Sequence, residues 1–143
     1  MKVVLLTTET LHHMYFLREV CKVYPIAHTI CETSSGAIPK FDVAHSFEEK
    51  REKYELNLLS AGEKRFLDDC SEVTKVESIN DDQSASCLKT LSPDVVIVFG
   101  TRKLSSSIIR ICPNGMVNLH GGDPERYRGL DSHLWAIYHG DFS

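Results

Sequence analysis

Short apolar runs recur along the chain at intervals that suit a repeating pattern of strands and helices. The strongest run is Pro93-Asp94-Val95-Val96-Ile97-Val98-Phe99-Gly100, in which a proline and a glycine delimit the apolar residues. Unbroken apolar runs of this length are typical of strands that are buried on both faces of a parallel sheet. We predict strands over residues 3–6, 26–31, 73–79, 93–100 and 115–120.

Helical patterns fill the intervals between these runs. Residues 11–23 carry apolar side chains at helical spacing, and Pro25 ends the segment. After a loop over 32–45, Ser46-Phe47-Glu48-Glu49 is a capping-box pattern that opens a charged, mostly solvent-facing helix toward Gly62. Shorter helices are predicted around 85–91 and over 105–112. This alternation predicts a doubly wound α/β fold with a mostly parallel, Rossmann-like sheet, whose ligands bind outside the carboxyl ends of the strands.

Length and composition fit one globular domain over residues 1–143. The chain has 42% hydrophobic and 25% charged residues, and its net charge of −4 argues against a nucleic-acid partner. Its longest apolar run is far shorter than the ~20 residues that cross a bilayer, and the N-terminus turns polar too early for a secretory signal. The five cysteines form no Cys-x-x-Cys pair, which predicts reduced core thiols in a cytoplasmic protein and no metal site.

The candidate chemistry lies at the end of the 115–120 run. Asn118 and His120 are two residues apart on a predicted strand, so their side chains share one face at the carboxyl edge. An amide donor beside an imidazole suits acyl transfer, because the amide stabilises an oxyanion while the imidazole moves protons near neutral pH. The alternative is a structural role, in which both side chains only make hydrogen bonds that stabilise the turn after the strand. Spacing alone does not decide between the catalytic and the structural role.

Around these residues the sequence resembles the folate-dependent formyltransferases. That family pattern is Asn-x-His, a proline-containing loop, Tyr-x-Gly, a short helix and Gly-Asp. The residues in that register are Asn118, His120, Tyr127, Arg128, Gly129, Trp135, Ala136, Gly140 and Asp141. The strand and loop from Asp94 to Leu104 are similar to those that hold the pterin ring in the family.

The resemblance implies transfer of a formyl group from N10-formyltetrahydrofolate to a primary amine. Asn118 and His120 take the catalytic roles in this reading. The implied cofactor-binding residues are Phe99, Gly100, Thr101, Arg102, Lys103 and Leu104.

The loop after His120 carries the predicted substrate-binding residues Gly121, Gly122, Arg126 and Arg128. Paired glycines let the backbone approach a ligand closely, and arginines grip phosphate or carboxylate groups in bidentate fashion. A solvated ion-pair loop is the alternative for the arginines. In the following segment, Leu134, Trp135, Ile137 and Tyr138 are interpreted as the packed face of a helix.

Two departures from the family pattern stand out. The loop reads Gly121-Gly122-Asp123-Pro124-Glu125, with its proline shifted by one position. The aspartate that tunes the histidine in the family lies downstream of the Gly-Asp turn, where this chain has ended. We therefore expect the N-terminal portion of a catalytic domain, incomplete at its C-terminal end, whose exposed sheet edge favours pairing with a second copy.

The acceptor is predicted from charge. The clusters Lys50-Arg51-Glu52-Lys53 and Glu63-Lys64-Arg65 are mixed in sign, which favours a nucleotide-linked amino sugar over methionyl-tRNA without excluding tRNA. Glycinamide ribonucleotide stays open as another acceptor. Two other classes stay open. One is a truncated, non-catalytic folate-binding module, and the other is an unrelated α/β ligand-binding domain. His12 and His13 are expected at the mouth of the sheet, more for partner contact or solvation than for catalysis.

Overall fold

A computed structural model describes residues 1–34, 46–60, 67–129 and 132–141. It contains a five-stranded, all-parallel sheet in the order β3-β2-β1-β4-β5. The strands are β1 (Val3–Thr8), β2 (His28–Glu32), β3 (Val73–Val76), β4 (Val95–Phe99) and β5 (Met116–Leu119). The helices are α1 (Leu11–Val23), α2 (Ser46–Ser60), α3 (Asp82–Leu91), α4 (Ser106–Ile109) and α5 (Ser132–Tyr138), with a 3₁₀ turn over Leu67–Asp69. This confirms the predicted Rossmann-like α/β fold.

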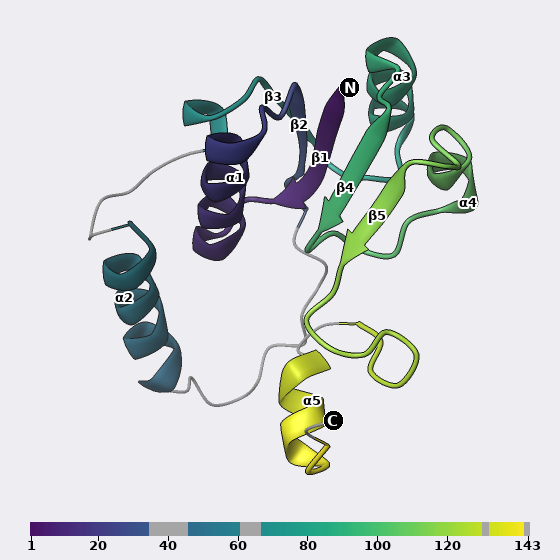
Figure 1. The fold of residues 1–143 in the computed structure, drawn as a ribbon. Helices are drawn as coiled ribbons and strands as arrows, with labels where there is room; N and C mark the ends of the chain where they lie inside the picture. The colour runs from purple at the N-terminus through teal and green to yellow at the C-terminus, as the bar shows by residue number, and fades with distance from the viewer. Residues whose placement is uncertain (35–45, 61–66, 130–131, 142–143) are drawn as a thin grey trace.

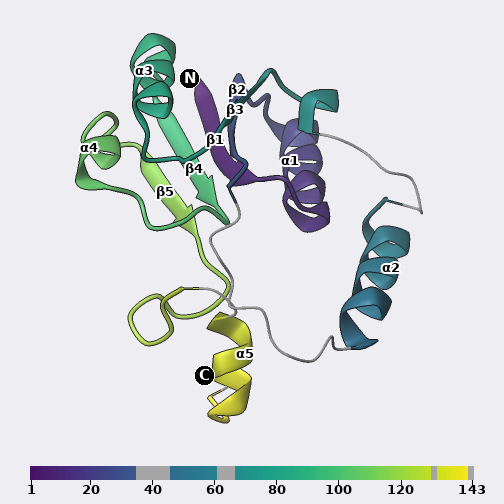
Figure 2. The same ribbon diagram turned by 180° about the vertical axis from the view of Figure 1, so that it is seen from behind.

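Helices cover both faces of the sheet, as Figures 1 and 2 show. Val4 and Leu6 of β1 point to the face that α3 and α4 cover, where they pack with Leu88 and Ile108. The alternate residues of β1 point to the opposite face, which α1 and the 3₁₀ turn cover. Because both faces are buried, β1 reads as the continuous apolar run that the sequence displays.

Side-chain caps fix the start of three helices. The hydroxyl oxygen of Thr10 accepts a hydrogen bond from the His13 N–H at the start of α1, and Ser105 does the same for the Ile108 N–H in α4. Asp81 accepts from the Ser84 N–H at 2.7 Å and begins α3. The loop predicted over 32–45 lies mostly outside the described residues, as do the capping-box side chains of residues 46–49.

Several boundaries differ from the sequence prediction: β1 extends to Thr8, α3 begins at Asp82 and α4 ends at Ile109. The differences at β2 and β3 have an identifiable physical cause. Strand β2 starts at His28 and ends at Glu32, because parallel pairing sets Val4 opposite His28 and Thr8 opposite Glu32. Strand β3 ends at Val76 rather than Ile79, since the Ile79 N–H leaves the ladder and donates to the Glu32 carboxylate at 3.0 Å.

The prediction of a packed apolar face on α5 is wrong. Leu134, Trp135 and Ile137 are 51%, 55% and 58% exposed, and Tyr138 is 78% exposed. The rings of Trp135 and Tyr138 pack edge-to-face with each other instead. Within α5 it is Ser132, at the start of the helix, that is buried.

Strand β5 forms one edge of the sheet and pairs with β4. Val117 is 52% exposed and Leu119 is 37% exposed, so apolar side chains are accessible at this edge. Pairing of this edge with a second copy stays a prediction. Within the residues that the structure describes, no helix combines the length and apolar character needed to span a bilayer.

Candidate active site

The carboxyl ends of β4 and β5 bring the two predicted catalytic residues beside the predicted cofactor loop. Asn118 lies opposite Val98 in the parallel register, and Leu119 lies opposite Phe99, where the loop over 99–104 begins. Asn118 is exposed and His120 is half-buried, so both lie within reach of a ligand at this edge. Asn118 lies on β5 as predicted, whereas His120 follows one residue after the strand ends at Leu119. Their shared face and their catalytic roles stay predictions.

The ring of His120 has a defined hydrogen-bonding arrangement. Its Nδ1 lies 2.8 Å from the carbonyl oxygen of Gly122. The Gly122 N–H also lies 3.4 Å from the same Nδ1. Because a carbonyl can only accept, the shorter contact favours the tautomer with the proton on Nδ1 and the lone pair on Nε2. An imidazole in this tautomer is equipped to take a proton from a group at the edge of the sheet.

The backbone at the two glycines after His120 lies close to the start of α5. A Cβ on Gly122 would lie 3.2 Å from the carbonyl carbon and the Cβ of Ser132, at the start of α5. A Cβ on Gly121 would meet His133 Nδ1 at 3.5 Å. The structural reason for glycine at position 122 is thus the contact with Ser132, and a role in substrate binding stays a prediction.

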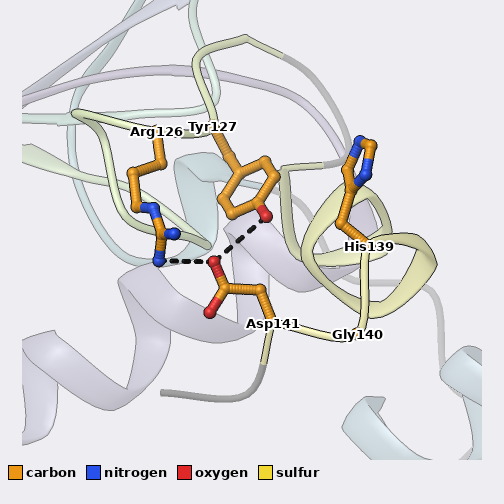
Figure 3. Close-up of a pocket in the computed structure, with 5 residues that line it drawn as sticks. All are labelled: Arg126, Tyr127, His139, Gly140 and Asp141. Atoms are coloured by element: carbon orange, nitrogen blue, oxygen red, sulfur yellow. Dashed lines mark hydrogen bonds and ion pairs between the residues drawn. The ribbon is translucent and has the colours of Figure 1, made fainter.

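Arg126 and Tyr127 converge on one carboxylate in a shallow, open pocket, which Gly140 and His139 also line (Figure 3). The Arg126 Nη1 lies 2.6 Å from Asp141 Oδ2, and the Tyr127 hydroxyl donates to the same oxygen at 3.1 Å. Desolvation and this hydrogen bond raise the pKa of the Tyr127 phenol. The carboxylate therefore ties the loop after His120 to the chain that follows α5.

The arginines predicted to bind substrate both contact protein groups. Arg126 pairs with Asp141, and Arg128 Nε donates to the Pro124 carbonyl at 3.1 Å. This favours the ion-pair alternative for Arg126, because part of its guanidinium group is already paired with the Asp141 carboxylate.

The loop over 99–104 is fastened by side chains of neighbouring segments. The Thr7 hydroxyl donates to the Phe99 carbonyl at 2.8 Å, and the Thr8 hydroxyl donates to the Gly100 carbonyl at 3.3 Å. Asn80 donates from Nδ2 to the Lys103 carbonyl at 3.1 Å. These contacts fix the backbone of the predicted cofactor loop at three of its carbonyl groups.

His13 is a residue of this edge whose environment the sequence prediction missed. It is 5% exposed, and its Nδ1 lies 3.0 Å from the Thr8 carbonyl, so the expectation of solvation is wrong for this residue. Burial, aided by the neighbouring His12, lowers the pKa of His13 from 6.5 to about 4. Its position three residues after the Thr10 cap, in the first turn after β1, was the available signal.

Comparison with known proteins decides the family. A family described as formyl transferase matches residues 23–143, which include every predicted site residue. The chain belongs to the formyl transferase family. This family member has a match over 71 residues, at 32% identity, with a methionyl-tRNA formyltransferase of Anaeromyxobacter sp. (strain K). The matches with the enzymes of that name from Thermosynechococcus vestitus and Clostridium tetani are 39% identical over 62 residues and 37% identical over 71 residues.

These matches cover parts of the proteins compared. The matched segments make up 48%, 43% and 48% of this formyl transferase chain, in the order given above. They make up 22%, 19% and 23% of the three relatives. The matched segment is thus about a fifth of the length of each of these relatives.

Proposed function

We propose that this formyl transferase moves a formyl group from N10-formyltetrahydrofolate to a primary amine. The observation that carries the proposal is the pair Asn118 and His120 at the carboxyl edge of β5, in a chain that belongs to the family. Both side chains are accessible there, and the His120 tautomer leaves Nε2 as a proton acceptor. A carboxamide donor and an imidazole acceptor fit a carbonyl substrate that undergoes attack by an amine.

The chemistry assigned to the two residues is complementary. The donor supplies the formyl group when it is bound. Asn118 Nδ2 donates a hydrogen bond to the formyl oxygen as negative charge accumulates on it. His120 Nε2 accepts the proton that the amine loses as its nitrogen bonds to the formyl carbon. It returns a proton to N10 as the bond between that carbon and N10 breaks.

The fixed loop over 99–104 contributes alignment. Thr7, Thr8 and Asn80 hold its backbone. We propose that this fixed loop orients a bound pterin ring toward Asn118. Alignment of two bound substrates removes much of the entropic cost of a bimolecular step.

Two acceptors have support. The relatives named methionyl-tRNA formyltransferase favour the amine of methionyl-tRNA. The net charge of −4 favours the second candidate, a nucleotide-linked amino sugar, because binding to a phosphate backbone normally needs a basic surface. The five free cysteines support a cytoplasmic setting for either reaction.

The test is release of tetrahydrofolate from N10-formyltetrahydrofolate in the presence of methionyl-tRNA, glycinamide ribonucleotide or a nucleotide-linked amino sugar. We expect release with one acceptor and none when the acceptor is omitted. A calorimetric titration with a stable folate analogue runs in parallel. Binding without release identifies a non-catalytic folate-binding module, and absence of both binding and release contradicts the proposed function.

A further inference from the structure

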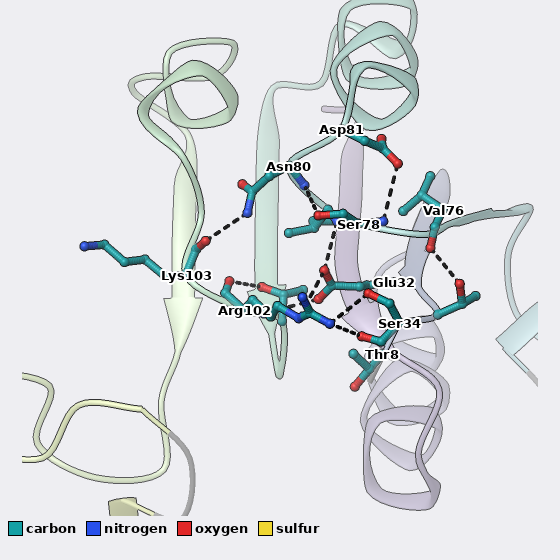
Figure 4. A network of polar contacts seen from close by, with 12 residues as sticks. Thr8, Glu32, Ser34, Val76, Ser78, Asn80, Asp81, Arg102 and Lys103 are labelled. Atoms are coloured by element: carbon teal, nitrogen blue, oxygen red, sulfur yellow. Dashed lines mark hydrogen bonds and ion pairs between the residues drawn. The ribbon is translucent and has the colours of Figure 1, made fainter. Parts of the chain in front are cut away.

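A buried carboxylate at the end of β2 has partners in two loops of the functional edge. The side chain of Glu32 is 1% exposed. It accepts hydrogen bonds from the Ile79 N–H at 3.0 Å and from the Arg102 N–H at 3.3 Å (Figure 4). The Arg102 Nε lies 3.8 Å from the same carboxylate. A buried charge is tolerated only when it is paired and hydrogen-bonded, and these contacts meet that requirement.

Arg102 and Glu32 reach toward each other across the end of β1. Strands β2 and β4 are not neighbours, because β1 lies between them in the sheet. Glu32 extends from β2 to the loop after β4, while Arg102 extends back from that loop to the segment after β2. There its Nη2 donates to the carbonyl and the hydroxyl of Ser34 at 2.7 and 2.8 Å.

The segment that receives Arg102 is itself anchored. The Thr33 N–H donates to the Val76 carbonyl at 2.8 Å, and the Ser34 N–H donates to the Glu77 carbonyl at 3.2 Å. Arg102 therefore attaches the loop over 99–104 to a platform built from the ends of β2 and β3. Glu32 and Arg102, which are 70 positions apart in sequence, therefore act together on the loop over 99–104.

A direct role for the Arg102 side chain in gripping an anionic ligand fits this geometry less well. Its Nη2 donates to two Ser34 oxygens and its Nε faces a carboxylate. A bidentate grip on a ligand would require these contacts to break first.

We propose that Glu32 and Arg102 are a positioning pair, which sets the course of the loop over 99–104 and thereby the affinity for the folate donor. The affinity part rests on the proposed function. Neither side chain touches the reacting atoms in this account. Loss of the pair weakens donor binding and leaves the rate of the chemical step at saturation unchanged.

The first experiment measures amide hydrogen exchange of the ligand-free chain. We compare Glu32→Gln and Arg102→Gln with Arg110→Gln, which removes an exposed guanidinium outside the loop. The pair predicts about tenfold faster exchange over 100–104 in the first two variants, with β1 unchanged and with no effect of Arg110→Gln. Unchanged exchange over 100–104 in Glu32→Gln overturns the positioning pair.

The second experiment separates positioning from direct charge recognition. Arg102→Lys keeps the positive charge and loses the fork that spans Glu32 and Ser34. In calorimetric titrations with 5-formyltetrahydrofolate, we expect Kd to rise about tenfold in Arg102→Lys, Arg102→Gln and Glu32→Gln alike. In the formyl-transfer assay, KM for the donor rises with kcat unchanged. Wild-type affinity in Arg102→Lys overturns the inference in favour of direct charge recognition.

Failure of the proposed function gives a different result. If the unmodified chain binds no folate analogue, the proposed function falls together with the affinity part of this inference. Exchange over 100–104 still decides whether Glu32 and Arg102 position the loop.

Discussion

The imidazole of His13 occupies the space that a side chain at position 100 would need. A Cβ on Gly100 would lie 2.0 Å from His13 Cε1 and 2.2 Å from Nε2, and Gly100 has a φ of +76°. The ring also packs edge-to-face on Phe99, with 4.5 Å between centroids. This contact joins the first turn of α1 to the start of the loop over 99–104.

Gly100→Ala is expected to destabilise the protein by about 3 kcal/mol, through left-handed backbone strain and the clash with His13. Gly140→Ala is the matched control, since its φ is +66° and no atom lies within 4 Å of its added Cβ. The control is expected to lose only about 1 kcal/mol. Urea unfolding measures both variants. Equal losses would show that the contact with His13 adds nothing.

The burial of His13 predicts a pH dependence of stability. Its pKa is about 4 in the folded protein and 6.5 when solvated. The unfolded chain therefore binds the proton more readily, and stability falls as the pH drops from about 6.5 to 4. Each pKa unit corresponds to about 1.4 kcal/mol, and solvent screening at the sheet edge reduces the total loss to roughly 2 kcal/mol.

Urea unfolding at several pH values in this window measures the effect. His13→Gln is the control, because it has no titrating ring, and its stability should change less between pH 6.5 and pH 4. An identical slope in the two proteins would assign the pH dependence to other groups.

Asn118→Ala and His120→Ala are expected to lower kcat without a matching loss of stability. Loss of an oxyanion donor reduces turnover by about 10²–10³-fold, and loss of a general base by about 10²–10⁴-fold. Because Asn118 is exposed, its variant should unfold within about 0.5 kcal/mol of wild type. Tetrahydrofolate release and thermal unfolding are measured on the same samples. Parallel loss of both would favour a turn-forming role for the two residues.

The Asp141 carboxylate is expected to influence the titration of Tyr127. Asp141→Asn removes the negative charge beside the phenol, so the raised pKa of Tyr127 should fall toward its usual value near 10. NMR titration of ¹³C-labelled tyrosine follows the ring directly. Asp94→Asn is a control at the opposite end of the sheet, where β4 begins. A phenol pKa that stays unchanged in Asp141→Asn would assign the whole shift to desolvation.

The strands were largely predictable because a strand that is buried on both faces appears in the sequence as a continuous run of apolar residues. Residues 95–99 form β4 within the predicted run, bounded by Pro93 and Gly100. The ends of β2 and β3 were less predictable, since pairing with β1 and the contact between Ile79 and Glu32 decide where they lie. These interactions depend on residues far away in sequence.

The candidate site also has one part that local sequence patterns predict and another part that depends on contacts between distant residues. Asn118 was predictable in position because it falls within a run with a strand pattern, and His120 follows one residue after β5 ends. The Glu32–Arg102 pair and the burial of His13 arise only when separate loops meet at the sheet edge, so no local pattern reveals them. Apolar spacing on α5 predicted packing, yet spacing does not show whether a partner surface exists.

The central claim is that Asn118 and His120 together hold a formyl group at the end of β5. A crystal structure of the chain with 5-formyltetrahydrofolate tests it most directly. We predict the pterin against the loop over 99–104, with Asn118 Nδ2 and His120 Nε2 both directed at the bound one-carbon group and at least one of them within about 3 Å of it. A pterin bound elsewhere, or side chains of Asn118 and His120 that point away from the one-carbon group, would contradict the account.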